Sequence, residues 1–267
     1  MKNWEEKFTS QHKGEPAENS GAAYRVALEA QPANGAAAGA SSGETAARPQ
    51  FPQTFDQMRL PLDTIWSNIL LESGGKTDLL MFCGSTPGEG CSFLSFHLAL
   101  FLAAVHNMKT LYVDTAVDVP DHIPCIPGMY GRPGLVSFLN GDEQLTSLVA
   151  ATDYANLFVL PSGVRQGVQS IHKNIISGNF LEELVGFCRS NFDIAIFDGQ
   201  PVASRPMTIE FAKRINKVIL VCRYGSSRRE VSMVSIEKLN KNGIPVMGVV
   251  LNDRQFTVPP LFYSIMK

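Results

Sequence analysis

The chain has 267 residues, of which 45% are hydrophobic and 18% are charged, and its formal net charge is −2 with a pI of about 6.2. This composition is typical of one sizeable α/β domain, and the near-zero charge argues against a surface for nucleic acid or anionic membranes. The five cysteines are widely spaced and include no Cys-x-x-Cys pair, which argues against a disulfide framework and a zinc site.

Residues 1–50 are expected to form a disordered tail in front of one folded domain at residues 51–267. Residues 31–50 are rich in Ala, Gly, Ser and Pro and bury too little apolar surface to offset the entropy of ordering. A short partner-binding helix at Ala22–Ala30 is the alternative for part of this tail. The N-terminal sequence has no apolar core like that of a signal peptide. The longest apolar run, Phe93–Val105, is too short to cross a bilayer, so we expect a cytoplasmic protein that reaches a membrane only through a partner.

Beyond residue 50, continuous apolar runs of strand length alternate with helical patterns. Strands are predicted at Leu79–Cys83, Thr110–Asp114, Leu157–Leu160, Asp193–Asp198, Val218–Cys222 and Val246–Leu251. Helices are predicted at Leu62–Glu72, Gly90–Asn107, Asn179–Ser190, Pro206–Ile215 and Arg228–Asn242. Continuous apolar strands indicate parallel strands that are covered on both faces. The sequence therefore predicts a doubly wound, mainly parallel α/β sheet of the P-loop type, with a ligand crevice beyond the carboxyl ends of its strands.

A glycine-rich turn, GSTPGEG, joins the first predicted strand to the second predicted helix. Such a turn aims backbone N–H groups at the start of the helix and forms an anion cradle. A working phosphate loop has a lysine directly after the last glycine, followed by Ser or Thr for Mg²⁺. Cys91 takes the lysine position here, and its thiol cannot supply a positive charge, whereas Ser92 keeps the hydroxyl. The predicted vestigial phosphate loop comprises Ser85, Pro87, Gly88, Glu89, Gly90, Cys91 and Ser92.

The thiol of Cys91 has a second interpretation. A helix N-terminus lowers the pKa of a cysteine, so a reactive thiol is the alternative to a side chain that only fills the loop. His97 lies in the apolar helix that follows, and we expect a core residue there rather than a ligand.

These motifs resemble those of the bacterial tyrosine kinases of capsule and exopolysaccharide synthesis, whose loop reads roughly S-x-P-G-E-G-K-S. The likeness extends over about Leu60–Asp253. It includes Gly134–Gly141 (GLVSFLNG), Asn156–Gly163 (NLFVLPSG) and the closing VVLN sequence. The resemblance implies a P-loop kinase fold, and it implies that Asn252 contacts an adenine.

The chain departs from this family at the positions that carry the chemistry. The second acidic motif of the family reads roughly D-A-D-L-R-R-P, and both aspartates serve Mg²⁺ and catalysis. Here Asp114 is kept, the second Asp becomes Ala116 and the first Arg becomes Asp118. The third family motif, roughly D-T-P-P, becomes D-G-Q-P and keeps Asp198, which could hold Mg²⁺-bound water or cap a turn.

Two further family features are missing. Leu60, Asp63 and Trp66 stand at the charged positions of the E-x-x-R-x-x-R motif that supports ring assembly, so a ring of the family type is not expected. The C-terminal tyrosine cluster, which is the phosphorylation target in the family, is reduced to Tyr263. A homo-oligomer of another kind stays open.

We therefore expect a non-catalytic, pseudokinase-like protein with no catalytic residues beyond the residual Asp114 and Asp198. No metal is expected, and if Mg²⁺ binds, its ligands would be Ser92, Asp114 and Asp198. The expected cofactor is none, or weakly bound ATP or ADP with Mg²⁺. The resemblance implies a membrane-embedded polysaccharide co-polymerase, a related export subunit or a true kinase homologue as the partner.

Two alternatives stay open. One is an active ATPase or protein-tyrosine kinase in which an arginine from a partner, or another cation of the chain, replaces the lysine. The candidates are Lys109, Arg132, Arg165 and Arg223. The other is a nucleotide sensor that binds ATP or ADP without turnover, because the glycine cradle and the helix dipole remain.

Overall fold

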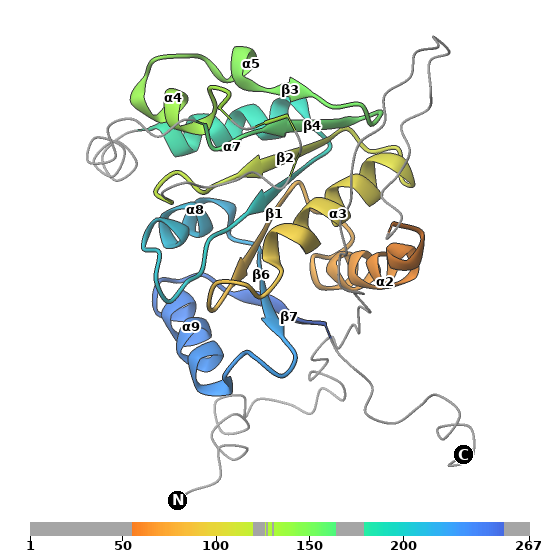
Figure 1. Ribbon diagram of the computed structural model, residues 1–267, viewed down its shortest axis with the longest axis vertical. Coiled ribbons are helices and arrows are strands. Elements are labelled where there is room, and N and C mark those ends of the chain that lie inside the picture. The colour runs from red at the N-terminus through yellow and green to blue at the C-terminus, as the bar shows by residue number, and fades with distance from the viewer. Residues whose placement is uncertain (1–54, 120–125, 127, 130, 164–178, 254–267) are drawn as a thin grey trace, which may run out of the picture.

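The computed structural model describes residues 55–119, 126, 128, 129, 131–163 and 179–253 (Figure 1). The strands are β1 (Leu79–Gly84), β2 (Thr110–Asp114), β3 (Ala150–Ala151), β4 (Leu157–Leu160), β5 (Ile194–Asp198), β6 (Val218–Arg223) and β7 (Val246–Asn252). They form one seven-stranded sheet in the order β3-β4-β2-β5-β1-β6-β7. All neighbouring strands run parallel except β3, which pairs antiparallel with β4. The doubly wound, mainly parallel fold is confirmed, while the predicted tail at residues 1–50 lies outside the described residues.

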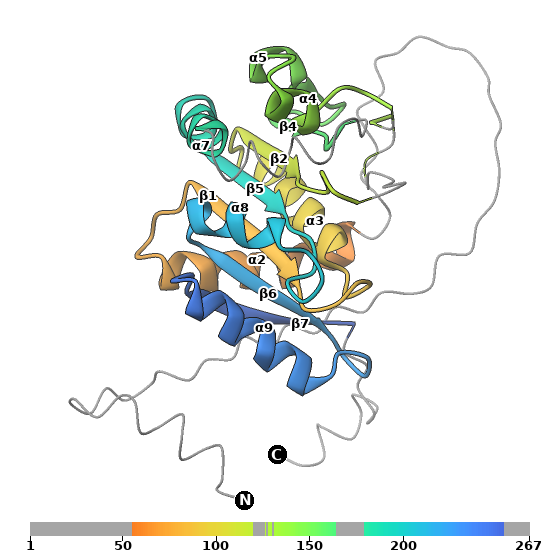
Figure 2. The ribbon, with the colours of Figure 1, turned by 90° about the vertical axis from the view of Figure 1, so that its left-hand side faces the viewer.

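Helices cover both faces of this sheet. They are α2 (Phe55–Glu72), α3 (Cys91–Ala104), α4 (Leu135–Asn140), α5 (Leu145–Leu148), α7 (Phe180–Asn191), α8 (Met207–Ile215) and α9 (Arg229–Lys241). Helices α2 and α3 lie on one face, and α8 and α9 lie on the other, toward the viewer in Figure 2. Along β1, Leu79, Met81 and Cys83 join the core beneath α7 and α8, whereas Leu80 and Phe82 join the core beneath α2 and α3. Burial on both faces is the reason that the strands read as continuous apolar runs.

The predicted strands and helices are all present within a few residues, with one larger error. The prediction that the first helix begins at Leu62 is wrong, because α2 begins at Phe55 and contains Pro61 in its interior. Proline removes a helical hydrogen bond, but Phe55 and Met58 are buried, and their packing holds the first turns in place. The short elements β3, α4 and α5 were not predicted from the sequence.

Helix α3 runs directly from the glycine-rich turn through the centre of one layer. Ten of its residues are buried, so it is apolar on nearly every side. His97 lies within this buried stretch, with Nδ1 2.7 Å from the carbonyl oxygen of Phe93, and burial lowers its pKa. This placement agrees with a core histidine. No helix in the described ranges is long and apolar enough to cross a membrane.

The two segments GLVSFLNG and NLFVLPSG, which are distant in sequence, lie against one another. The backbone N–H of Leu135 donates to Pro161 and that of Val136 donates to Ser162, both at 2.8 Å. A Cβ at Gly134 would lie 2.1 Å from the carbonyl oxygen of Pro161, so only glycine allows this approach. Both motifs of the family resemblance thus have a packing role in this chain.

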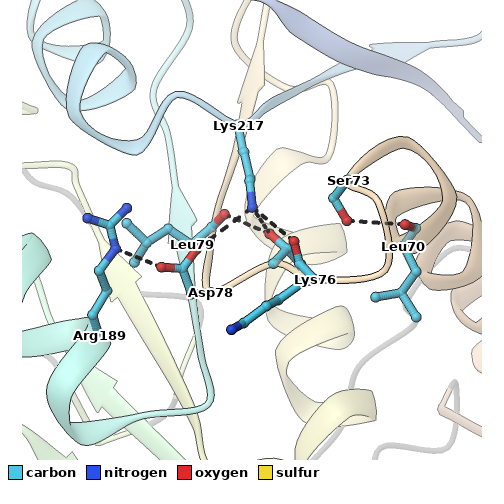
Figure 3. A network of polar contacts seen from close by, with 8 residues as sticks. Leu70, Ser73, Lys76, Asp78, Leu79, Arg189 and Lys217 are labelled. Carbon is cyan, nitrogen blue, oxygen red and sulfur yellow. Dashed lines mark hydrogen bonds and ion pairs between the residues drawn. The ribbon is translucent and has the colours of Figure 1, made fainter.

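Polar contacts hold the amino end of β1, at the edge of the sheet opposite the glycine-rich turn (Figure 3). Arg189 donates to the Asp78 carboxylate at 2.6 Å, and Lys217 lies 3.8 Å from it while donating to the Lys76 carbonyl and the Thr77 hydroxyl. Burial favours the neutral carboxyl, but the hydrogen bond from Arg189 and the two positive charges outweigh it and lower the pKa of Asp78. These contacts tie α7 and β6 to the strand that carries the turn.

Candidate functional site

A pocket of about 360 Å³ lies at the carboxyl end of β1. Its walls are the glycine-rich turn, the first two residues of α3 and the segment after β5 as far as Arg205. Because β5 and β6 flank β1, this position is the crevice at which open α/β sheets bind ligands. The predicted phosphate loop therefore forms one wall of a real pocket.

The loop presents backbone donors to this pocket. Gly88 and Gly90 have φ angles of 83° and 85°, in the left-handed region that favours glycine. Helix α3 has no side-chain cap, and the N–H groups of Gly88, Gly90, Cys91 and Ser92 have no acceptor within the described ranges. All four residues line the pocket. The loop thus retains the donor arrangement of an anion cradle.

The carboxylate of Glu89 is turned into the loop and away from the pocket. It is 3% exposed, and its Oε2 accepts hydrogen bonds from the backbone N–H groups of Ser85 and Thr86. Its Oε1 accepts from the Thr86 hydroxyl at 3.1 Å and from the Ser227 hydroxyl, which reaches in from the segment after β6. Glu89 therefore holds the loop closed on itself, a role that the motif alone did not reveal.

Asn252, at the end of β7, braces the same loop. Its Nδ2 donates to the carbonyl oxygen of Glu89 at 3.1 Å, and the residue is only 8% exposed. A Cβ at Gly90 would lie 2.1 Å from this nitrogen, so loop and strand are in direct contact. The adenine contact of Asn252 stays a prediction, and its side-chain amide already has a structural partner.

Cys91 begins α3 and is partly buried beside the segment after β5. Its Sγ donates to the carbonyl oxygen of Gly199 at 3.5 Å. Burial, and then the negative charge of Asp198, raise the pKa of the thiol well above its ordinary value. These effects act against that of the helix N-terminus, so the surroundings of Cys91 oppose the alternative of a reactive thiolate.

Asp198 ends β5 directly before the segment that lines the pocket, and it is 1% exposed. The Tyr112 hydroxyl donates to its Oδ2 at 2.9 Å, a contact that the sequence analysis did not predict. Burial, and then the charge of Asp114, raise the pKa of Asp198 to about 6, although hydrogen bonding from Ser92, Tyr112 and Cys91 acts in the opposite direction. Asp198 therefore takes up a proton at a higher pH than an ordinary aspartate does.

Asp114 ends β2 directly beside Asp198, because the two residues are paired in register. Its Oδ1 accepts a hydrogen bond from the backbone N–H of Ala116 at 3.0 Å, so it also caps the turn after the strand. Carboxylates and hydroxyls are suitable Mg²⁺ ligands, and Ser92, Asp114 and Asp198 lie in one region. No cluster of three or more His, Cys, Asp or Glu residues that could hold a metal occurs among the residues described. Mg²⁺ binding stays a prediction.

Arg205 is a site residue that the sequence analysis missed. Its Nη1 donates to the backbone carbonyl of Asp118 at 3.1 Å and lies 3.8 Å from that residue's carboxylate. Of the residues that line the pocket, Arg205 is the one with a charged side chain. Its place in the segment after β5, near the carboxyl edge of the sheet, was the available signal.

The cations proposed as replacements for the lysine lie elsewhere. Arg223 pairs with Asp253 at 2.8 Å, and Lys109 precedes β2 at the opposite edge of the sheet. Neither of them lines the pocket, and Arg132 does not line it either. Arg165 lies outside the described residues, as does Tyr263.

Comparison with known proteins agrees with this geometry, although no family model matches the chain. The chain is 25% identical over 183 residues to the tyrosine-protein kinase Ptk of Acinetobacter johnsonii, covering 68% of this chain and 24% of that protein. It is 25% identical over 180 residues to the tyrosine-protein kinase CpsD of Streptococcus agalactiae, covering 67% and 76%. The homologues of this chain are bacterial tyrosine-protein kinases. The chain spans about a quarter of the length of the Acinetobacter kinase.

Solved kinase structures have the same fold. The VpsO kinase domain is 26% identical with a TM-score of 0.62, covering 75% of this chain and 98% of that domain. The kinase domain of the Escherichia coli tyrosine kinase ETK gives a TM-score of 0.64 at 18% identity, covering 75% and 78%. The matched region is thus a P-loop kinase domain in fold, and its activity has to be argued from its own residues.

Proposed function

We propose that this chain is a non-catalytic, kinase-like P-loop protein that acts as a regulatory or scaffolding partner in bacterial capsule or exopolysaccharide synthesis and export. The observation that carries this proposal is the state of Cys91. In place of the lysine stands a thiol that donates to Gly199 and is held in its neutral form by burial and by Asp198.

Electrostatics argues against phosphoryl transfer at this site. Catalysis of that reaction depends on positive groups placed where charge develops on the phosphoryl oxygens. The loop contributes no such group, and two buried carboxyl groups, Asp114 and Asp198, stand behind it. Losing one charge-assisted contact removes about 1.5–3 kcal/mol of stabilisation. A scaffold with these residues favours binding over turnover.

The retained packing supports a binding role over decay of the fold. Both cores are complete on either side of the sheet, and Glu89, Ser227 and Asn252 keep the loop in shape without contributing charge to the pocket. The homologous tyrosine kinases suggest the context, so the proposed partner is a membrane-embedded polysaccharide co-polymerase, a related export subunit or an active kinase. We place the protein in the cytoplasm, beside the membrane.

The test measures turnover by the purified chain with Mg²⁺-ATP, as phosphate release and as phosphotyrosine. We expect neither from the wild type. Cys91→Lys restores the charge of a working loop, and Cys91→Ser is its matched neutral control. Hydrolysis by the wild type that disappears in Asp114→Ala would overturn the proposal in favour of an active ATPase or kinase with a rearranged site.

A second candidate function is a nucleotide sensor without turnover. It is favoured by Gly88, Gly90, Cys91 and Ser92, which line the pocket and whose backbone N–H groups have no acceptor in the part of the chain that is described. ATP or ADP with Mg²⁺ would be the ligand of such a site. Calorimetric titration with both nucleotides separates a sensor, which binds them, from a scaffold that does not.

A further inference from the structure

We propose that Arg205 supplies the positive charge of the pocket in place of the missing lysine, so that the pocket binds the phosphates of a nucleoside diphosphate or triphosphate. The inference rests on the second candidate function, the nucleotide sensor, because it names the ligand and the cation of that non-catalytic site. The charge would come from the segment after β5, whereas a P-loop lysine comes from the start of α3.

Among the described residues, the pocket wall contains a single charged side chain, that of Arg205. Apart from Arg205, the lining residues are uncharged, and Glu89 keeps its carboxylate inside the loop. The pocket therefore combines one guanidinium with the N–H groups at the start of α3. A volume of about 360 Å³ lies within the range of small-molecule sites. A wall of this kind favours an anion with several oxygens.

Arg205 uses only part of its hydrogen-bond donors within the described residues. Nη1 is engaged by the Asp118 carbonyl, but Nε and Nη2 have no acceptor anywhere in the described ranges. The side chain is 32% exposed, so the guanidinium is accessible. The Nε and Nη2 fork is well suited to two parallel hydrogen bonds with a phosphate group. The guanidinium is anchored on one side and open on the other.

Backbone hydrogen bonds fix Arg205 relative to the loop. Val202 N–H donates to the Gly84 carbonyl at 2.9 Å, and Ala203 N–H donates to Ser85 at 3.3 Å. The N–H of Arg205 itself donates to Pro201 at 2.9 Å. These bonds join the segment that carries the guanidinium to the strand and loop that carry the cradle. The guanidinium of Arg205 and the N–H groups of the loop are therefore held in a fixed position relative to one another.

Asp118 explains how the cation stays in place. It is 8% exposed, and a buried carboxylate without a cation nearby would be strongly destabilising. Asp118 thus provides an anchor for Arg205, which comes from another segment of the chain.

The test is calorimetric titration of the full chain with ADP, ATP, AMP, adenosine and inorganic phosphate in the presence of Mg²⁺. We expect the wild type to bind ADP and ATP. Arg205→Ala should weaken both by about 10- to 100-fold, as expected for loss of a charge-assisted contact. Arg205→Lys should retain part of the affinity, and binding of adenosine should not change. The matched control is Arg59→Ala, which removes an exposed arginine of α2 outside the pocket.

Several outcomes would overturn the inference. The first is a wild type that binds neither ADP nor ATP, and the second is an ADP affinity that is equal in wild type and Arg205→Ala. Inorganic phosphate bound as tightly as ADP would overturn the nucleotide assignment. If Arg205 only neutralised Asp118, Arg205→Ala would lower Tm and leave the ADP affinity of the folded protein unchanged.

Failure of this inference is distinguishable from failure of the proposed function. ATP hydrolysis by the wild type would overturn the non-catalytic function even if the loss of affinity in Arg205→Ala were observed. Unchanged ADP affinity in Arg205→Ala would overturn the role of Arg205 and leave the absence of turnover standing. Melting curves of each variant show whether it is folded before its affinity is compared.

Discussion

Asp114 and Asp198 end two adjacent parallel strands in register, so their carboxyl groups are neighbours at a buried edge of the sheet. Two like charges in such a place disfavour ionisation of at least one of them. Here the pKa of Asp198 is raised to about 6, by burial first and by Asp114 second. The pair therefore links the stability of the fold to pH.

We expect Asp198→Asn to stabilise the protein at pH 8 and to have less effect at pH 5. Because the pKa of Asp198 is higher in the folded chain than the ordinary value of 3.8, its favourable contribution is complete below pH 3.8 and is lost as the pH rises through about 6. The difference between a pKa of 3.8 and one of about 6 corresponds to about 3 kcal/mol in the free energy of unfolding. Urea unfolding at both pH values measures it, with the exposed Asp142→Asn as the control. The same pH dependence in wild type and Asp198→Asn would contradict the expectation.

Glu89→Gln is expected to destabilise the fold by about 1–3 kcal/mol, the cost of leaving buried donors unsatisfied. An amide can accept through only one oxygen, whereas the carboxylate accepts from Ser85, Thr86 and Ser227. Urea unfolding gives the free energy, and Glu230→Gln on the exposed side of α9 is the matched control. Equal stability of the two variants would show that the carboxylate does not hold the loop.

Gly134→Ala tests the contact between the two motifs that pack together. The added Cβ would lie 2.1 Å from the Pro161 carbonyl, and a clash of this kind costs about 1–3 kcal/mol or more. Gly186→Ala is the control, because nothing lies within 4 Å of a Cβ there and alanine is favoured in helix α7 by up to about 1 kcal/mol. We expect Tm to fall in the first variant and to hold or rise in the second. A Tm of Gly134→Ala that equals or exceeds that of the wild type would refute the close approach.

Cys91 is expected to react slowly with maleimide at pH 7, despite its place at a helix N-terminus. Burial and Asp198 raise the pKa of the thiol, and the thiolate is the reactive form. The rate should rise with pH and should be higher in Asp198→Asn, which removes the adjacent negative charge. Mass spectrometry of the peptide that contains Cys91 measures the labelling. Rapid labelling of the wild type at pH 7 would favour the activated thiol after all.

The sheet could be predicted from the sequence because burial on both faces makes its central strands continuous apolar runs. Helix α2 was predicted too short because Pro61 is a local breaker, while Phe55 and Met58 are held by tertiary packing that a local pattern does not contain. Strand β3 has two residues, Ala150 and Ala151, which is too short for any periodicity. Prediction failed where distant segments decide the local structure.

The candidate site was predictable where residues are adjacent in sequence. The turn from Gly84 to Ser92 could be assigned from its spacing alone, because backbone geometry and residue order determine an anion cradle. Arg205 could not be assigned in this way, because a charged residue in a loop is normally interpreted as a surface residue. Only the order of strands in the sheet shows that this loop lies beside β1. The same holds for Ser227, whose hydrogen bond to Glu89 joins residues 138 positions apart.

The brace between Asn252 and Glu89 spans 163 positions, and this distance determines when the site can exist during protein synthesis. The loop emerges from the ribosome early, with strand β1, but β5, β6 and β7 follow much later. The loop gains Ser227 only once the segment after β6 is released, and it gains Asn252 only with the last strand, β7. A nascent chain that stops before β7 would therefore carry the complete phosphate-loop sequence without the hydrogen bond from Asn252. The pocket takes its final shape only when the whole sheet has formed.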